Sequence, residues 1–446
     1  VAEFTACASE VERAVQMGVG GHFSASEEAT IVTDAIPGRE DGSPRSSTSG
    51  GLLIRFAVLG TAQVAGSALS FVTAVIITRV GGADVFGQIS VGLSVLAYAS
   101  LATNFGTDVS GVRMAAADPG RVGTMLPAIV LIRLFFAALS LATILALAPV
   151  LQPDPQGQVV LLIICASLLA VCFLPVWLPQ GLENLKVTAL CIFAPFAFTF
   201  VLTAFSALFS PTALGFAFSR FGGDALLALA LSIWALRFYP RPSWSQIRST
   251  IRDLILQSGA IAGSQLVRGL AFLSDILVVS FFYQDAVVGH FSAAYRIYLL
   301  FVAVSAMYFI ALFPKLARAA ASGAEALKTE LRGTLVRTVP GTAALTLVFL
   351  AAVPWLLPFA FGDGFTVAVP ALQLLVVAAA LNFAHKNFSR TLIAMGHSGA
   401  EFRMTAIATF VGLTFKVVGT WQWGITGTAL AILLGELFLL ALLAWS

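Results

Sequence analysis

The sequence contains few charged residues, and this scarcity excludes a soluble protein. Only 11% of the 446 residues are Asp, Glu, Lys or Arg, whereas soluble domains carry about 25%. Hydrophobic residues make up 59% of the chain, and the mean hydropathy is +0.93. Apolar stretches long enough to cross a hydrocarbon core of about 30 Å as helices recur from residue 52 to the C-terminus. The composition therefore predicts an all-α membrane protein with many spans.

The sequence also lacks the residue patterns that bind metals and nucleotides. The four cysteines and four histidines are scattered, without a CxxC pair or a Cys/His group, so we expect no zinc or haem site. The GxxxxGK[ST] phosphate-binding loop of ATP-hydrolysing proteins is missing too. We expect no cofactor, no metal and no nucleic-acid partner.

The N-terminal segment differs in composition from the rest of the chain. Residues 1–50 hold eight of the 22 acidic residues, and Ser, Gly and Pro are concentrated in residues 37–51. This composition predicts a disordered tail. It is not a secretory signal peptide, because no basic segment precedes an apolar core. We expect a cytoplasmic tail over 1–50 that transport does not require.

From residue 52 onward the apolar segments predict twelve transmembrane helices, arranged as two pseudo-symmetric six-helix lobes. The expected spans are 52–79, 86–105, 125–149, 158–180, 188–210, 213–236, 255–283, 287–313, 336–361, 366–396, 400–420 and 425–445. His385, Lys386 and Arg390, near the end of the tenth span, are expected at or beyond the membrane surface.

Lys and Arg in the connections predict the orientation. Nineteen of the 25 basic residues lie at or near connections on one side of the predicted spans, and Arg79 alone lies on the other. Because cytoplasmic loops are enriched in Lys and Arg, both termini are expected in the cytoplasm.

Two features indicate that the chain is divided into halves. The link 237–254 has apolar residues at 3–4 spacing beside Arg248 and Arg252, which predicts an amphipathic interfacial segment. Residues 71–83 can be laid over 272–284 at an offset of 201, and Gly87 over Gly289 at an offset of 202. Such parallel repeats predict an N-terminal lobe over 51–250, including the linker, and a C-terminal lobe over 251–446.

Two stretches resemble a known family. Residues 69–113 (LSFVTAVIITRVGGADVFGQISVGLSVLAYASLATNFGTDVSGVR) resemble the opening hairpin of Wzx-type polysaccharide repeat-unit flippases. Residues 274–318 resemble a later pair of spans of the same proteins, with Asp275, Gly289 and the run AAYR at 293–296. These flippases belong to the multidrug/oligosaccharidyl-lipid/polysaccharide exporter superfamily, and the likeness extends over 52–446.

The resemblance implies a function. It implies two lobes around a central cavity that opens alternately to the cytoplasm and the periplasm of a bacterial inner membrane. The implied cargo is an undecaprenyl-diphosphate-linked oligosaccharide, flipped for later polymerisation into lipopolysaccharide O-antigen, capsule or exopolysaccharide. A polysaccharide polymerase and a chain-length regulator would be protein partners. The sugar, the coupling ion (proton or sodium) and the oligomeric state stay open.

Basic residues inside the spans are the candidate cargo-binding groups. Charged side chains within spans usually face a bundle interior or a wet cavity, and Arg can bind two phosphate oxygens at once. We expect Arg268 and Arg296 to line the cavity; for Arg133, extension toward the cytoplasmic interface is an equal alternative. Lys416, near the outer end of its span, is a fourth candidate.

The acidic residues inside the spans are candidates for ion pairs or for coupling. Arg220 and Asp224 are four residues apart and would pair on one helical face. Asp275 would neutralise Arg268 or another basic side chain, or take up a driving ion. Glu436 is the other coupling candidate, with Lys416 as its expected partner.

Two other functions compete with flipping. A cation-coupled multidrug or toxin antiporter of the same superfamily would have a similar span count, but its cavity should be acidic or apolar to suit cationic drugs. A membrane enzyme such as a lipid-linked glycosyltransferase would need a sizeable external loop or domain. The spans hold five basic residues against Asp224, Asp275 and Glu436, and the external connections are short, so the sequence favours an anionic cargo and no enzyme.

Overall fold

The computed structural model describes residues 49–236 and 242–445, except for the side chains of 49–57, 236, 268, 270–272, 310 and 311. The predicted tail lies outside the described residues apart from its last two, as does the part of the linker at 237–241. No strand occurs within the described ranges. The α-helices are α3 (Ser49–Asn104), α4 (Thr107–Ala117), α5 (Val122–Leu151), α6 (Pro155–Cys165), α7 (Ser167–Cys172), α8 (Trp177–Gly181), α9 (Leu185–Phe209), α10 (Ala213–Leu236), α11 (Trp244–Phe282), α12 (Asp285–Ala321), α13 (Ala324–Phe361), α14 (Val369–Ala394) and α15 (Ser398–Trp445).

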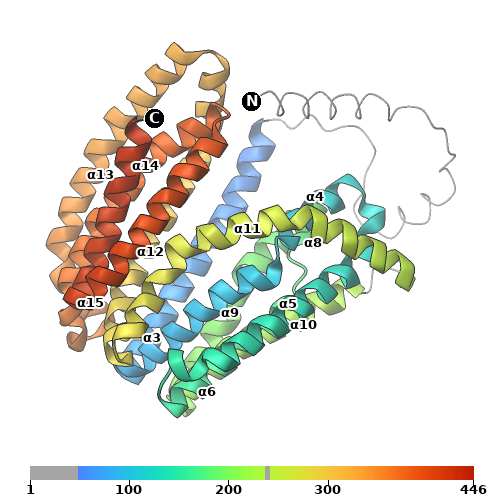
Figure 1. Ribbon diagram of the computed structural model, residues 1–446, viewed down its shortest axis with the longest axis horizontal. Coiled ribbons are helices and arrows are strands. Elements are labelled where there is room, and N and C mark those ends of the chain that lie inside the picture. Colours follow the sequence, from blue (N-terminus) through green and yellow to red (C-terminus); the bar gives the residue numbers. More distant parts are fainter. Residues whose placement is uncertain (1–48, 237–241, 446) are drawn as a thin grey trace. The chain divides into compact units, whose positions relative to one another are not determined.

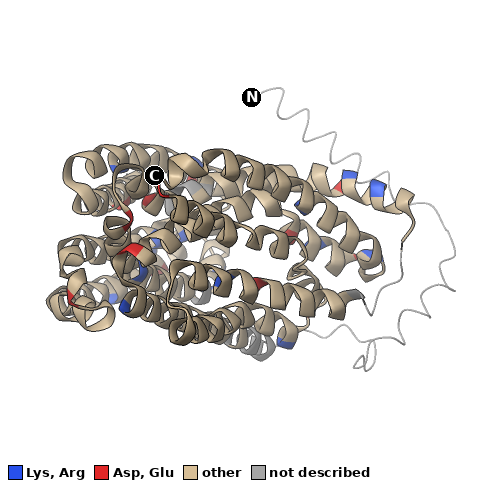
Figure 2. Cartoon of the chain, turned by 90° about the horizontal axis from the view of Figure 1, so that it is seen from below, with Lys and Arg blue, Asp and Glu red and all other residues tan. Residues whose placement is uncertain are grey.

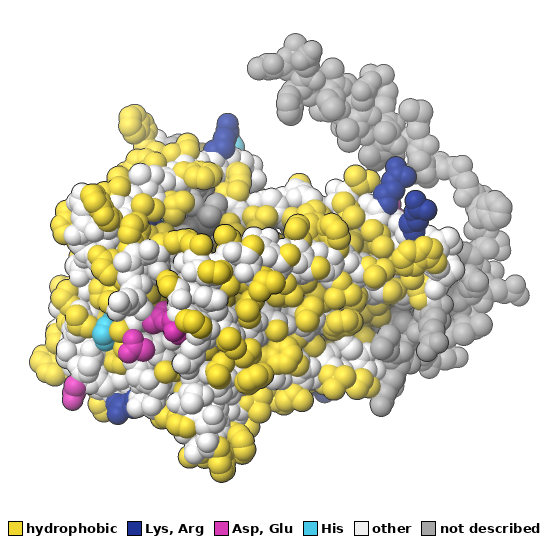
Figure 3. Space-filling view, turned by 60° about the horizontal axis from the view of Figure 1, so that its bottom comes forward, with side chains coloured by type: hydrophobic (Ala, Val, Ile, Leu, Met, Phe, Trp, Pro, Cys, Tyr) yellow, Lys and Arg dark blue, Asp and Glu magenta, His cyan; other side chains and the backbone are white. Residues whose placement is uncertain are grey.

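The described helices confirm the predicted all-α membrane architecture. Nine helical segments are long and apolar enough to cross a membrane, and α11 holds a shorter apolar stretch, Leu273–Phe282. Two of the nine, α3 and α15, contain two arms each, which accommodates the twelve predicted passes. Charged residues are sparse along the ribbon (Figure 2), and the face seen in Figure 3 is mainly hydrophobic. Exposed side chains such as Phe135, Trp355 and Phe359 suit contact with lipid.

The two arms of α3 and of α15 are each joined by a tight reversal. In α3 the helical conformation breaks at Gly82, whose φ of 79° favours glycine. In α15 it breaks at Trp423 and Gly424. Beyond this second break the arms pack closely, with the hydroxyls of Thr420 and Thr428 2.8 Å apart. Small residues at such contacts let membrane helices approach one another.

Helix α11 joins the two halves of the chain. It begins at Trp244, where Ser243 and Gln246 form a capping box, and continues without a break to Phe282. Leu254 is fully buried in a cluster with residues of α4, α5 and α8. The predicted interfacial segment is therefore the first part of a long helix that packs on the N-terminal half. In Figure 1 α11 crosses from these helices toward α12 and α15. The lobe boundary at 250–251 stays a prediction.

The predicted internal repeat coincides with a reciprocal contact between α3 and α12. A Cβ atom on Gly87 would lie 1.9 Å from the carbonyl oxygen of Asp285, and one on Gly289 would lie 2.0 Å from that of Ala83. Both pairs are related by the offset of 202 that aligns the two glycines in the sequence. We call this the glycine contact. Any side chain at either position would force the two backbones apart.

Candidate functional site

Two polar cavities lie inside the described helices. The first, about 270 Å³, lies among both arms of α3, α9, α10 and α12. We call it the arginine cavity; its polar lining consists of Arg220, Arg296, Ser70, Thr73, Ser100, Thr199 and Thr203. The second, about 230 Å³, lies among α11, α12, α14 and α15. We call it the acid–base cavity; its charged and histidine lining consists of Asp275, His385, Lys386, Arg390, Glu401, Lys416 and Glu436.

Arg296 reaches the arginine cavity from α12. Its Nη1 donates to the hydroxyl of Ser70 on α3 at 3.0 Å, and its guanidinium carbon lies 5.8 Å from the centre of the Phe86 ring. The described residues provide no carboxylate partner for it. Because a guanidinium has five N–H donors, this arrangement leaves donors for an anionic ligand. The expectation that Arg296 lines a cavity agrees with this position.

Arg220 reaches the same cavity from α10. Its Nη2 forms an ion pair with Asp224 at 2.9 Å, one helical turn away. Its Nε and the hydroxyl of Thr199 are buried without a hydrogen-bond partner in the described part of the chain. Buried donors without an acceptor are unfavourable, so an anion in this cavity would satisfy groups that the protein itself leaves unsatisfied. No Asp or Glu appears in the described lining.

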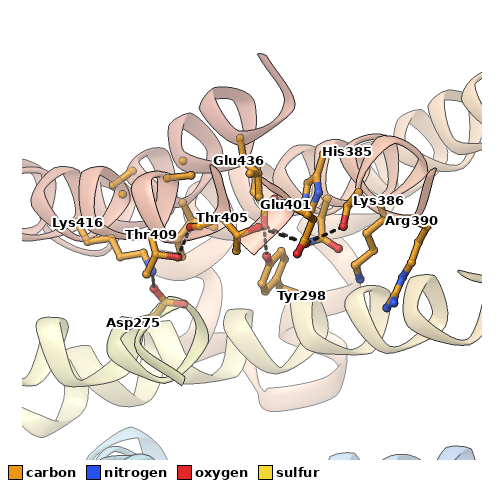
Figure 4. Close-up of a pocket in the computed structure, with 18 of the residues that line it drawn as sticks. Asp275, Tyr298, His385, Lys386, Arg390, Glu401, Thr405, Thr409, Lys416 and Glu436 are labelled. Carbon is orange, nitrogen blue, oxygen red and sulfur yellow. Dashed lines mark hydrogen bonds and ion pairs between the residues drawn. The ribbon is translucent and has the colours of Figure 1, made fainter. Parts of the chain in front are cut away.

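Lys416 and Asp275 form the first of two networks in the acid–base cavity (Figure 4). The Lys416 Nζ lies 2.5 Å from Asp275 Oδ1, and the hydroxyl of Tyr295 donates to Asp275 Oδ2 at 2.6 Å. Both charged side chains are almost fully buried. The sequence correctly expected Asp275 to be near a basic side chain, but the partner comes from α15 rather than from Arg268, whose side chain lies outside the description.

Glu436 forms the second network. Its carboxylate lies 2.8 Å from Nε2 of His385 and accepts hydrogen bonds from Asn382 at 3.0 Å and Tyr298 at 3.2 Å. The expected partnership of Glu436 with Lys416 is therefore wrong, because Lys416 pairs with Asp275. Three helices supply the groups: α12, α14 and the second arm of α15.

His385 lies in the interior of the helix bundle. It is only 7% exposed, and with Lys386 and Arg390 it lines the acid–base cavity. The position of these residues relative to the membrane surface stays a prediction. Asn382, His385 and Ser389 recur at 3–4 spacing in α14, which places them on one helical face. This polar stripe in an apolar helix was the signal that could have identified the site.

Arg133 lies in neither cavity. It is 2% exposed and donates to Asp108 at 2.6 Å, Thr107 at 2.9 Å, the Leu174 carbonyl at 3.0 Å and Asn104 at 3.2 Å. These contacts join α5 to the start of α4 and to the turn after α7. The arrangement is that of a structural connection, without donors directed at a cargo.

Other contacts between the halves lie near the glycine contact. Gln152 at the end of α5 donates to Asp285 in the first turn of α12 at 3.1 Å. Arg79 on α3 donates to the carbonyls of Phe359 and Ala360 at the end of α13. The two halves are thus held together at the end that the distribution of Lys and Arg assigns to the outside.

The fold is that of known flippases and multidrug transporters. The structure is similar to lipid II flippase MurJ in an inward closed conformation, at 13% identity over 87% of each chain with a TM-score of 0.70. It is also similar to an inward-facing multidrug resistance MATE family transporter, at 16% identity over 88% of this chain and 93% of that one, TM-score 0.61. A third similar structure is a MOP superfamily transporter from Pyrococcus furiosus described as having a binding pocket of reverse polarity (14% identity, 88% and 94% covered, TM-score 0.53).

The sequence itself identifies the family. Residues 52–320 match the polysaccharide biosynthesis protein family. The match spans more than half of the chain, so this protein belongs to that family. No curated protein sequence matches the chain. The protein is therefore a multi-pass membrane protein of polysaccharide biosynthesis with a transporter fold.

Proposed function

We propose that this protein flips a polyprenyl-diphosphate-linked oligosaccharide from the cytoplasmic to the periplasmic leaflet of the bacterial inner membrane. The lipid carrier is undecaprenyl diphosphate, and the product feeds polysaccharide synthesis. The family supports a role in that synthesis, and the fold is shared with a lipid-linked cargo flippase.

The arginine cavity is the observation that carries the proposal. It offers Arg220, Arg296 and five hydroxyl groups and has no carboxylate in its described lining. A diphosphate cannot cross hydrocarbon without partners for its charge, and guanidinium groups bind phosphate oxygens in pairs. Arg296 belongs to α12 and Arg220 to α10, so both halves of the chain hold the diphosphate. A cationic drug would find two like charges here, which disfavours the multidrug antiporter.

Reconstituted protein tests this function. Liposomes containing the full chain and a lipid-linked oligosaccharide extracted from its host should show flipping of the sugar to the opposite leaflet. Losing one charged hydrogen-bonding partner removes about 1.5–3 kcal/mol, so Arg296→Ala should slow flipping about tenfold or more. The flipping rate of Arg296→Lys should lie between those of the unmodified protein and Arg296→Ala, because lysine keeps the positive charge but lacks the planar guanidinium group. Arg121→Ala, in an exposed ion pair, is the matched control, and an unchanged rate in Arg296→Ala would contradict the proposal.

Orientation is tested by single cysteines in a variant without native cysteines. Cysteines at Asp154 and Asp363 should react with an impermeant thiol reagent added to whole cells, and a cysteine at Lys328 should not. Reversed labelling would overturn the proposed cytoplasmic position of both termini.

A further inference from the structure

Asp275 and Glu436 in the acid–base cavity are already contacted by donor groups. Asp275 is paired with Lys416 and accepts from Tyr295. Glu436 faces Nε2 of His385 and accepts from two further donors, the amide of Asn382 and the hydroxyl of Tyr298. The two networks differ in the kind of cation that they contain. A lysine is a fixed positive charge near neutral pH, whereas histidine side chains in general gain and lose their charge there.

His385 is placed to exchange a proton without leaving Glu436. Its Nε2 lies 2.8 Å from the carboxylate, while its Nδ1 is buried without a hydrogen-bond partner among the described residues. A proton can therefore bind to Nδ1 and convert the imidazole to an imidazolium, which remains paired with Glu436. Release of the same proton restores the neutral ring.

The surroundings of this pair contain charges of both signs. Besides His385 and Glu436, the charged or titratable side chains that line this cavity are Asp275 from α11, Tyr298 from α12, Lys386 and Arg390 from α14, and Glu401 and Lys416 from α15. Lys386 donates to the hydroxyl of Ser305 at 3.1 Å. Lys386 and Arg390 extend from the same helix as His385 (Figure 4). The carboxylate of Glu436 is the acidic group in direct contact with the ring, at 2.8 Å.

Sodium does not fit the same groups. A hard cation needs several oxygen atoms with free lone pairs directed at one point. At Glu436 the three neighbours present nitrogen and hydroxyl donors, so their hydrogens point at the carboxylate. At Asp275 the ammonium group of Lys416 already occupies the place of a cation.

We propose that the coupling ion is a proton, that it binds at the pair of His385 and Glu436, and that it acts on the arginine cavity through α12. The link to cargo rests on the proposed function of the arginine cavity. Protonation from the outside and release to the cytoplasm move one proton inward on one imidazole, while Lys416 and Asp275 remain paired.

Helix α12 is the physical connection between the two cavities. Within ten consecutive residues it carries Gly289 of the glycine contact, Arg296 of the arginine cavity and Tyr298, which donates to Glu436. A helix moves as a stiff unit over this length. A change at Glu436 that shifts Tyr298 therefore also shifts the cargo-binding arginine and the contact between the halves.

Distance measurements without cargo test the proton site. Nitroxide labels at Gln156→Cys and Val367→Cys, in a full chain without native cysteines and in liposomes, report the separation of the two halves at the end near the glycine contact. Between about pH 8 and about pH 5.5, the range in which histidines titrate, the ratio of two distance populations should change at least about fivefold, a usual lower limit for coupling. Replacing choline by sodium at fixed pH should change nothing.

Variants identify the group that responds. His385→Asn and Glu436→Gln should each abolish the pH response, and His397→Asn, at an exposed histidine, should retain it. A response to sodium in place of pH, or a pH response that survives in both cavity variants, would overturn the proposal.

Inorganic pyrophosphate separates this proposal from the proposed function. Calorimetry of the purified full chain, in buffers of different ionisation enthalpy, should show that pyrophosphate binding releases protons, because coupling between two sites is reciprocal. His385→Asn should bind pyrophosphate without releasing protons, and Arg296→Ala should not bind it but should keep the pH-dependent distance change. Binding without proton exchange in the unmodified protein would refute the connection through α12. No binding at all, with the pH response intact, would count against the cargo site and leave the proton site standing.

Discussion

The two cavities differ in whether their charged side chains find partners of opposite charge within the protein. Among the described residues of the arginine cavity, Arg296 contacts a hydroxyl group and a ring face, and the buried Nε of Arg220 has no acceptor. In the acid–base cavity, Asp275 faces a lysine and Glu436 faces a histidine, each within 2.8 Å. Donor groups that lack acceptors favour the binding of an anionic ligand. Where the charged groups are already paired with one another, a change in charge requires that one of them gains or loses a proton. Two cavities of similar volume are therefore suited to different tasks.

Among variants that test this difference between the cavities, we expect the largest loss of stability from a substitution of Lys416. Lys416→Ala leaves the buried carboxylate of Asp275 without its cation, and removing one partner of a buried ion pair destabilises by about 3–5 kcal/mol. Protein abundance and the melting temperature should both fall. Adding Asp275→Asn should restore abundance and most of the flipping, because the double variant leaves no unpaired buried charge at this position. Failure of the double variant to recover abundance would show that Lys416 has a role beyond the pair.

The corresponding pair in the arginine cavity should behave differently. Arg220→Ala leaves Asp224 unpaired, so abundance should fall; Arg220→Ala with Asp224→Asn should restore it. Flipping should nonetheless stay about tenfold lower in the double variant, since a charged donor to the cargo is worth about 1.5–3 kcal/mol. Full recovery of flipping would remove Arg220 from the cargo site.

A smaller effect is expected at the glycine contact. Gly289→Ala would place a methyl group against the carbonyl of Ala83, and overpacking of this kind destabilises by about 1–3 kcal/mol. The penalty applies only while the halves touch, so the population should shift toward the separated state. Gly289→Ala should make a cysteine at Gln156 react faster with thiol reagents, and Gly333→Ala, where no atom lies near, is the control.

The smallest effect is expected at a surface ion pair. Arg121 and Asp253 lie 3.4 Å apart with nearly half of each side chain exposed, and such pairs contribute about 0–1 kcal/mol. Arg121→Ala should leave the melting temperature nearly unchanged, with flipping intact. A loss comparable to that of Lys416→Ala would contradict the distinction between buried and exposed pairs on which the first prediction depends.

The location of individual charges was harder to predict than their presence. Arg220 and Asp224 are one turn apart, so local helix geometry was enough to expect their pair. Lys416 with Asp275 and His385 with Glu436 each join residues far apart in the chain, and a list of charges does not say which will meet. Arg133 shows the same limit, because its partners Asp108 and Thr107 lie on another helix.

The sequence by itself determined the all-α membrane architecture with many apolar helices and the offset that relates Gly87 to Gly289, whereas the exact number of passes stays a prediction. Hydropathy and short repeats are local or periodic properties of the sequence. They are sufficient to predict membrane helices because each span must form its backbone hydrogen bonds within itself. Only the tertiary structure decided which charges meet. Pairing depends on helix rotation and on the depth at which each helix crosses its neighbours, and small residues such as those in the arms of α15 set how closely helices approach. This packing brought His385 into the interior beside Glu436, and placed Arg296 between the two halves with no carboxylate partner in the described part of the chain.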